Sequence, residues 1–444
     1  MMNTRWFARA LGVAWLLALG ACGDTALLRV SDGMGPQPVL PAPVATLIPT
    51  VNVAPGVGWP AGAAPVGAPG TRVQAFARDL DHPRWLLVLP NGDVLVAETN
   101  RPPRPPRGFD VRRWLAGLFM QRAGAGTPSA NRITLLRDTQ GTGVADQRFV
   151  LLDGLSSPFG MALVGDELMV ANADAVLAFG FKVGDTRISG PGRLVARLPG
   201  GPINHHWTKN LLASPDGRTL YASVGSNSNI AEGGLAQEDG RAAIWQIDVA
   251  TGQSRLFATG LRNPVGMAWV PGSPLLWTVV NERDELGSDL VPDYLTSVRD
   301  GGFYGWPWRY FGTHTDARVT EPAPAGLLDR TLVPDYALGP HTASLGLASS
   351  VGHRLPPPFA DGVFVGQHGS WNRRPHSGYQ VVFVPFAAGR PTGLPVPVLT
   401  GFLSPDGQAW GRPVGVAVDR QGALLVADDV GNAVWRVSAA AAPR

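Results

Sequence analysis

Five residues suited to proton transfer or anion binding each come shortly before an apolar run of the sequence: His206, Arg262, Asn263, His341 and Arg412. Imidazole changes its protonation near neutral pH, so histidine is the usual side chain for accepting a proton. A guanidinium group holds a carboxylate through two parallel hydrogen bonds. The five residues are far apart in the sequence, so a shared site requires elements that bring them together.

The apolar runs belong to a pattern that recurs six times from about Thr71 onward. Each copy has a Pro or His with an apolar run, a Gly-centred turn, and a second apolar run that ends in a polar residue. This composition predicts a β-hairpin. The copies run from His82 to Glu98, Ser157 to Asn172, His205 to Gly225, Asn263 to Asn281, His341 to Gln367 and Arg412 to Asp428.

The repeat predicts an all-β protein, a six-bladed β-propeller. The turns lie roughly 50 to 90 residues apart, which is the length that a four-stranded blade and its loops require. The 56 Gly and 41 Pro residues favour a turn-rich β fold over helices. Loops that enter the innermost strands of a propeller converge at one mouth of its channel, so we expect the five residues to meet there.

The overall charge excludes one class of function. The 444 residues carry a formal net charge of only +3, and Lys182 and Lys209 are the only lysines among 37 basic residues. A nucleic-acid-binding protein would concentrate far more positive charge on one face. We therefore expect no nucleic-acid partner.

The N-terminus has the features of an export signal. Arg5 and Arg9 precede an apolar stretch that is too short to span a bilayer, and it ends in Leu-Gly-Ala before Cys22. Residues 1–22 therefore resemble a lipoprotein signal peptide, with Cys22 as the lipidation site; the alternative is an ordinary signal peptide with an incidental cysteine. This predicts a lipid-anchored protein of the bacterial cell envelope, on the periplasmic or extracytoplasmic side, without an intramolecular disulfide.

Two further segments complete the predicted organisation. Residues 23–70 are rich in Pro, Ala and Gly and predict an extended linker between the anchor and a propeller domain at 71–444. Within that domain, residues 101–130 form an insertion with a predicted short helix from Asp110 to Arg122. The helix is interpreted as a lid, as a basic surface facing lipid, or as a helix packed over the propeller.

Five motifs occur in order along the chain: GLRNPVGMAW from Gly260, NERDELGSDLVPDYL from Asn281, GGFYGWP from Gly301, HGSWNR from His368 and WGRPVGVAV from Trp410. Together they resemble the pyrroloquinoline quinone (PQQ)-dependent sugar dehydrogenases, particularly their sorbosone and soluble glucose dehydrogenase branches. The resemblance covers Thr71 to about Val437.

The resemblance implies PQQ at the channel mouth, a calcium ion on its quinone side and a histidine base that takes the substrate's hydroxyl proton. It places His206 at the position of the base, with His205 as the alternate. One departure concerns the residue that orients this base. Soluble glucose dehydrogenases have an aspartate there, whereas this chain has Ser226.

The remaining expected ligands also come from the resemblance. Arg262 and Asn263 match the Arg-Asn pair that contacts PQQ, whose three carboxylates suit guanidinium groups. Calcium would be held by backbone carbonyls near Glu282 and Arg283, because a hard cation prefers oxygen. Further candidates for cofactor binding are His341, from its expected place at the mouth, and His368, Trp371, Asn372, Arg373 and Arg412, from the motifs.

The implied function is PQQ-dependent oxidation of a sugar, sugar aldehyde or polyol by hydride transfer. A single cysteine rules out a covalent haem motif, so electrons would leave to a separate acceptor. Two alternatives remain open at this point. One is a non-catalytic propeller that binds a protein or glycan, and the other is a metal-dependent lactonase on a six-bladed propeller.

Overall fold

A computed structural model describes residues 23–46, 49–103 and 126–440 of the chain. The described residues form β-strands and three short 3₁₀ helices, η1 (Val30–Gly33), η3 (Leu235–Glu238) and η4 (Leu328–Arg330). The predicted signal peptide with Cys22 and the predicted helix at 110–122 lie outside them. No helix among the described residues has the length and apolar character needed to cross a membrane.

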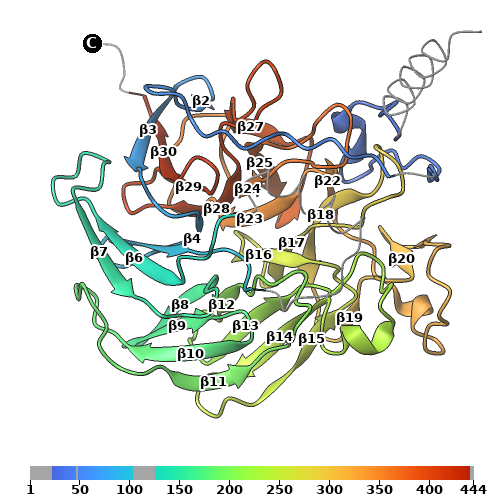
Figure 1. The fold of residues 1–444 in the computed structure, drawn as a ribbon, viewed down its shortest axis with the longest axis horizontal. Helices are drawn as coiled ribbons and strands as arrows, with labels where there is room; N and C mark the ends of the chain where they lie inside the picture. Colours follow the sequence, from blue (N-terminus) through green and yellow to red (C-terminus); the bar gives the residue numbers. More distant parts are fainter. Residues whose placement is uncertain (1–22, 47–48, 104–125, 441–444) are drawn as a thin grey trace, which may run out of the picture.

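Six antiparallel blades form a ring, so the predicted six-bladed β-propeller is confirmed (Figure 1). Blade one consists of β4 (Pro83–Val88), β5 (Val94–Glu98), β6 (Arg132–Arg137) and β7 (Gln147–Leu152). Blade two consists of β8 (Met161–Val164), β9 (Glu167–Ala171), β10 (Ala175–Gly180) and β11 (Arg193–Arg197). Blade three consists of β12 (Leu211–Ala213), β13 (Thr219–Val224), β14 (Ala243–Asp248) and β15 (Ser254–Thr259).

Blade four consists of β16 (Pro264–Trp269), β17 (Leu276–Val280), β18 (Pro292–Val298) and β22 (Tyr336–Pro340). Blade five consists of β23 (Ser344–Ser349), β24 (Gly362–Gln367), β25 (Gln380–Ala387) and β27 (Val396–Thr400). Blade six consists of β28 (Pro413–Val418), β29 (Leu424–Asp428), β30 (Ala433–Ala439) and β3 (Thr71–Ala77). Short strands extend these sheets or pair beside them: β1 (Met34–Gly35), β2 (Val66–Gly67), β19 (Gly302–Phe303), β20 (Arg309–Tyr310), β21 (His314–Thr315) and β26 (Arg390–Pro391).

The two ends of the domain close the ring within blade six. Strand β3, from the start of the propeller sequence, pairs antiparallel with β30, from its end, with Val73 opposite Val437. The first strands of neighbouring blades contact one another around the axis. This closure leaves few free strand edges, which is how a propeller avoids edge-to-edge association.

The predicted hairpins are the first two strands of each blade. In blades three and six they turn at Gly217 and Gly422, which have φ values of +70° and +85° that favour glycine. Strands β4, β16 and β28 begin with a proline, which lacks the N–H that a ladder requires, and their register shifts within the next few residues. This local geometry sets the direction of the residue just before each strand.

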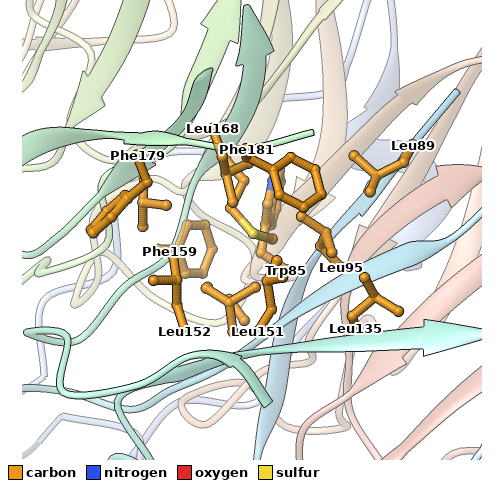
Figure 2. Close-up of a cluster of buried hydrophobic side chains, with 14 of the residues drawn as sticks. Trp85, Leu89, Leu95, Leu135, Leu151, Leu152, Phe159, Leu168, Phe179 and Phe181 are labelled. Carbon is orange, nitrogen blue, oxygen red and sulfur yellow. The ribbon is translucent and has the colours of Figure 1, made fainter. Parts of the chain in front are cut away.

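Apolar side chains fill the space between neighbouring blades. Figure 2 shows the cluster formed mainly by blades one and two, in which the tilted rings of Trp85 and Phe159 pack with centroids 4.8 Å apart. Phe159 also meets Trp207 edge to face at 6.0 Å, which ties blade three to the same cluster. These contacts fix the angle between blades and therefore the spacing of the loops at the mouth.

The segment predicted as a linker contacts the propeller along much of its length. Its Asp24 carboxylate accepts a hydrogen bond from the backbone N–H of Ser288, at 2.6 Å. Further along, the indole N–H of Trp59 donates to Asp428 at 2.6 Å, and the Trp59 ring packs on Phe402 and Trp435. In this structure, residues 24–46 and 49–59 therefore cover part of blades four to six.

Candidate functional site

One mouth of the propeller gathers the loops that enter the first strands and those that leave the second strands. Strand pairing places both loop types at the same end of each blade, as in the pair Pro264 and Val280. Backbone hydrogen bonds link these loops between blades three and four, from Ser226 N–H to the Arg262 carbonyl at 2.8 Å. The expected convergence of His206, Arg262 and Asn263 agrees with this arrangement.

His206 has one ring nitrogen fixed by the protein and the other free. Its Nδ1 lies 2.8 Å from the Ser226 carbonyl oxygen and 3.0 Å from the Ser226 hydroxyl. A carbonyl oxygen only accepts hydrogen bonds, so Nδ1 carries the proton and Nε2 has the lone pair. Nε2 has no hydrogen-bond partner in the described part of the chain and is not a buried unpaired atom. The Ser226 backbone thus orients the ring without supplying charge.

Burial and neighbouring cations lower the proton affinity of His206. Burial lowers the pKa of its imidazole well below 6.5, and Arg262, His205 and Arg241 lower it further. His205 is exposed, and its ring lies edge to face with that of His206 at 4.7 Å. The largest effects of neighbouring titratable groups on this pKa come from Arg262, His205 and Arg241, and none of these is a carboxylate.

Arg262 and Asp284 connect blades three, four and five. The Arg262 guanidinium is 2% exposed and lies 3.2 Å from the Asp284 carboxylate, which also accepts from Asn372 at 2.8 Å. His341 reaches the same carboxylate at 3.7 Å and pairs with the Gly287 carbonyl at 2.9 Å. Burial alone would raise the pKa of Asp284, but His341, Arg262 and Asn372 hold it below its ordinary value.

Arg412 is a buried cation with no acidic partner within ion-pair distance among the described residues. Its side chain lies over the ring of Tyr379 at 4.8 Å, and the residue is 3% exposed. The guanidinium donates to the carbonyls of Gly369 at 3.4 Å and Ala54 at 3.3 Å, and its Nε is unpaired. Oδ1 of both Asn263 and Asn372 is also buried and unpaired. An uncompensated buried cation is the feature expected of a site that binds an anion.

One ring nitrogen of His368 forms a bifurcated contact with both carboxylate oxygens of a buried aspartate. Its Nε2 lies 2.9 and 3.1 Å from the two carboxylate oxygens of Asp429. Asp429 also accepts from Arg84 at 2.7 Å and lies 3.5 Å from Nε2 of His82. Burial opposes ionisation of Asp429, but His368, His82 and Arg84 together hold its pKa far below the usual range.

Sequence reasoning identified His368 but missed Asp429, Arg84 and His82. A signal was present, because Asp429 follows the second strand of its blade as His368 follows the second strand of the preceding blade. The predicted repeat ended at Asp428, whose carboxylate is instead used by Trp59, Trp435 and the backbone.

Two other expected cofactor ligands lie under the N-terminal segment. Arg373 is 1% exposed, and its guanidinium contacts Asp289 at 3.2 Å and the Leu28 carbonyl at 3.1 Å. The Trp371 carbonyl accepts a hydrogen bond from the N–H of Asn52 at 2.8 Å. Arg373 therefore has protein partners where Arg412 has almost none.

Of the two backbone carbonyls expected to hold calcium, that of Glu282 is already used by a guanidinium group. The Glu282 carbonyl accepts a 2.6 Å hydrogen bond from Arg262, and the Arg283 side chain pairs with Glu282 and Asp316, each at 3.1 Å. The described residues hold no group of three acidic, His or Cys side chains that could bind a metal. A calcium ion at Glu282 would share its oxygen with a cation, so these residues do not fit the ion as they stand.

Known structures share this fold. The PQQ domain of pyranose dehydrogenase from Coprinopsis cinerea, in its holo form, is 21% identical with a TM-score of 0.65, covering 87% of this chain and 100% of that one. A Trichoderma reesei protein of carbohydrate-active enzyme family AA12 is 20% identical with a TM-score of 0.66, covering 88% and 99%. The PQQ-bound aldose sugar dehydrogenase of Streptomyces coelicolor is 17% identical with a TM-score of 0.53, covering 84% and 99%.

Comparison of the sequence with known proteins identifies the family of this chain. An uncharacterized protein of Borreliella burgdorferi is 27% identical over 248 residues, which span 55% of this chain and 64% of that protein. The TrAA12-like family matches residues 124–293 and 328–440, which is more than half of the chain and includes strands of all six blades. With the propeller fold and the mouth described above, this match establishes that the chain belongs to the TrAA12-like family.

Proposed function

We propose that this protein oxidises a sugar, sugar aldehyde or polyol with PQQ bound at the mouth. The observation that carries the proposal is Arg412, a buried guanidinium without an acidic partner among the described residues. Lys209 and Arg241 are likewise buried and pair with oxygens of Asn204 and of the backbone. PQQ carries three carboxylates, and buried guanidinium groups such as those of Arg412 and Arg241 suit them.

The similar structures support the same cofactor. The Coprinopsis and Streptomyces proteins are, by name, a PQQ domain of pyranose dehydrogenase and a PQQ-bound aldose sugar dehydrogenase. When bound, PQQ supplies a quinone that accepts a hydride from the carbon bearing the substrate hydroxyl. In the proposed site, Arg412 holds a carboxylate of the cofactor, while Asn263 and Asn372 contact its polar edge.

An imidazole at the mouth takes the hydroxyl proton as the hydride leaves. His206 is the candidate from the sequence motif, because Nε2 is free while the Ser226 carbonyl fixes the ring. Arg262 stabilises the loop around this base through Asn229 and Asp284. We assign no role to calcium in this reaction.

The proposal extends to the partners of the enzyme. Electrons leave the reduced cofactor to a separate acceptor, since the sequence has one cysteine and no covalent haem motif. We propose attachment to the cell envelope through a lipid on Cys22. Fatty-acid labelling of the wild type and of Cys22→Ala tests this attachment, and equal labelling of both would refute it.

Reconstitution tests the activity. Purified protein is titrated with PQQ, and dye reduction is then measured with a panel of aldoses, sugar aldehydes and polyols. We expect saturable PQQ binding and PQQ-dependent dye reduction by at least one sugar. Lactone hydrolysis without PQQ would favour the lactonase, and glycan binding without any PQQ binding would favour the non-catalytic propeller.

A further inference from the structure

The N-terminal segment, residues 23–46 and 49–59, follows the rim of the mouth across three blades (Figure 1). Three of its backbone N–H groups donate to carbonyls of loops in blades four, five and six: Val44 to Leu286 at 3.0 Å, Asn52 to Trp371 at 2.8 Å and Val57 to Ala409 at 2.9 Å. These loops leave β17, leave β24 and enter β28, so all three lie at the mouth end of their blades. The segment is therefore part of the rim.

The start of the segment is fixed at the same rim. The Asp24 carboxylate accepts a hydrogen bond from the Ser288 N–H at 2.6 Å, and the Ala26 N–H donates to the Arg374 carbonyl at 2.8 Å. Cys22 stands two positions before Asp24, which the chain spans in about 7 Å at most. Acyl chains on the sulfur of Cys22 would therefore leave the protein beside the mouth.

Exposed apolar side chains accompany the segment along the rim. Four of them, which we call the apolar arc, are Leu27, Val44, Val51 and Val57, with exposed fractions from 36% at Val51 to 91% at Leu27. The backbone at each position, or at the next one, is bound to a mouth loop; the Leu27 N–H donates to Asp289 at 2.7 Å. Because these hydrogen bonds hold the arc in place, its apolar surface stays in water unless another apolar phase covers it.

The composition of the rim segment suits lipid as that phase. No Asp, Glu, Lys or Arg occurs between Asp32 and Arg72. By contrast, three of the exposed apolar residues elsewhere, Val183, Leu194 and Leu256, each directly follow a basic residue. A charged side chain resists transfer into a bilayer, whereas an uncharged apolar strip can lie at the boundary between headgroups and acyl chains.

We infer that the apolar arc lies on a lipid bilayer, so that the mouth of the propeller faces the membrane. The inference rests on the lipid on Cys22 proposed above and adds the orientation that the anchored enzyme adopts. A single anchor would leave the domain free to turn, and stable attachment to a membrane usually takes two signals. The acyl chains beside Asp24 and the arc across blades four to six supply both on one face. This orientation places the proposed cofactor site on the membrane side of the protein.

Single-cysteine labelling tests the orientation. The chain has no cysteine besides Cys22, whose thiol is blocked in the lipidated protein, so one introduced cysteine carries a fluorophore at a known place. Val51→Cys and Val57→Cys report on the arc. Val351→Cys is the matched control, because Val351 is 66% exposed in the connection between β23 and β24, at the opposite end of the blade. Each lipidated, full-length variant is labelled in detergent and added to preformed phosphatidylcholine vesicles.

Two quenchers should give opposite results at the two ends of the propeller. A nitroxide on the lipid acyl chains should quench the labels at positions 51 and 57 several-fold more than the label at position 351. Dithionite added to the water should bleach the two rim labels several-fold more slowly. Val57→Asp should restore dithionite access to the label at position 51 with fatty-acid incorporation unchanged, and Val351→Asp should not.

The possible results separate this inference from the proposals on which it depends. Equal quenching at both ends, or stronger lipid quenching at position 351, would overturn the inference while the anchor stands. Rim labels already shielded in detergent, with a doubled particle mass, would show that a second copy of the chain covers the arc, and would overturn it too. A wild type that incorporates no fatty acid would refute the anchor and this inference with it. PQQ-dependent dye reduction is measured separately, so none of these results decides the proposed oxidation.

Discussion

The carbonyl oxygen of Ser226 lies 2.8 Å from Nδ1 of His206 and fixes the tautomer of that ring. The contact depends on the close approach of three chain segments at Gly225. A Cβ atom at this glycine would lie 2.3 Å from Oδ1 of Asn263 and 2.5 Å from Cβ of His206. Glycine is therefore the residue that allows His206 and Asn263 to face the same mouth.

Substituting this glycine should disturb both neighbours. We expect Gly225→Ala to destabilise the fold by about 1–3 kcal/mol, the usual cost of overpacking, and to weaken PQQ binding. Chemical denaturation and PQQ titration measure the two effects. Gly233→Ala is the matched control, because its nearest neighbour would be 3.5 Å away. Equal stability of the two variants would contradict the argument.

Replacing Arg412 should weaken PQQ binding without lowering the stability of the fold. A buried guanidinium without an ion pair costs folding free energy, so Arg412→Met should leave the melting temperature unchanged or higher. PQQ affinity should fall by about 10- to 100-fold, because a charge-assisted contact is lost. Calorimetry and PQQ titration check both parts.

Arg373 provides the contrasting case for Arg412. It is equally buried but pairs with Asp289. Arg373→Met should therefore lower stability by about 3 kcal/mol, since it removes the cation paired with Asp289 and leaves that carboxylate with the backbone N–H groups of Leu27 and Leu28. If Arg412→Met proves as destabilising as Arg373→Met, the view of Arg412 as an uncompensated cation is incorrect.

His82 should make the fold sensitive to acid. Burial lowers the pKa of this imidazole from 6.5 to about 4, against the opposing effect of Asp429. Between these values the unfolded chain binds a proton that the folded chain does not, so stability is complete above pH 6.5 and falls as the pH drops toward 4. The loss from this group is about 3 kcal/mol.

Replacing His82 should remove that part of the acid sensitivity. Asn suits the site, because His82 has a φ of +54° and Asn tolerates this conformation. Urea unfolding of wild type and His82→Asn at pH 7 and pH 4 measures the difference, with His314→Asn as the control. If the wild type and the variant lose equal stability between pH 7 and pH 4, His82 is not the group responsible for the acid sensitivity.

Calcium should not be required for cofactor binding. The Glu282 carbonyl is used by Arg262 at 2.6 Å, and a divalent cation at that oxygen would face a guanidinium. We expect PQQ affinity to be the same in EDTA and in calcium chloride, measured by fluorescence titration. A clear gain of affinity with calcium would mean that Arg262 leaves the carbonyl when the cofactor binds.

Short-range patterns in the sequence were sufficient to predict the architecture. Alternation of apolar runs with Gly turns, as at Gly217 and Gly422, specifies hairpins locally. Six such hairpins, spaced as they are here, predict the closed ring of a six-bladed propeller. The position of a residue relative to its strand also follows from the sequence. His206, Asn263 and Arg412 were therefore expected at one mouth before any contact was known.

The partners of these residues were decided by the tertiary structure. His368 meets Asp429 only because blades five and six are neighbours, and Arg373 meets Asp289 only because blades four and five are neighbours. Arg373 meets Leu28 only because the N-terminal segment lies across the propeller. The Pro- and Ala-rich composition of that segment predicted a linker. Composition indicates how extended a segment is, but it does not indicate whether the segment packs against the propeller. A hydrogen bond between distant segments depends on angles set by packing throughout the ring, and no local pattern in the sequence encodes those angles.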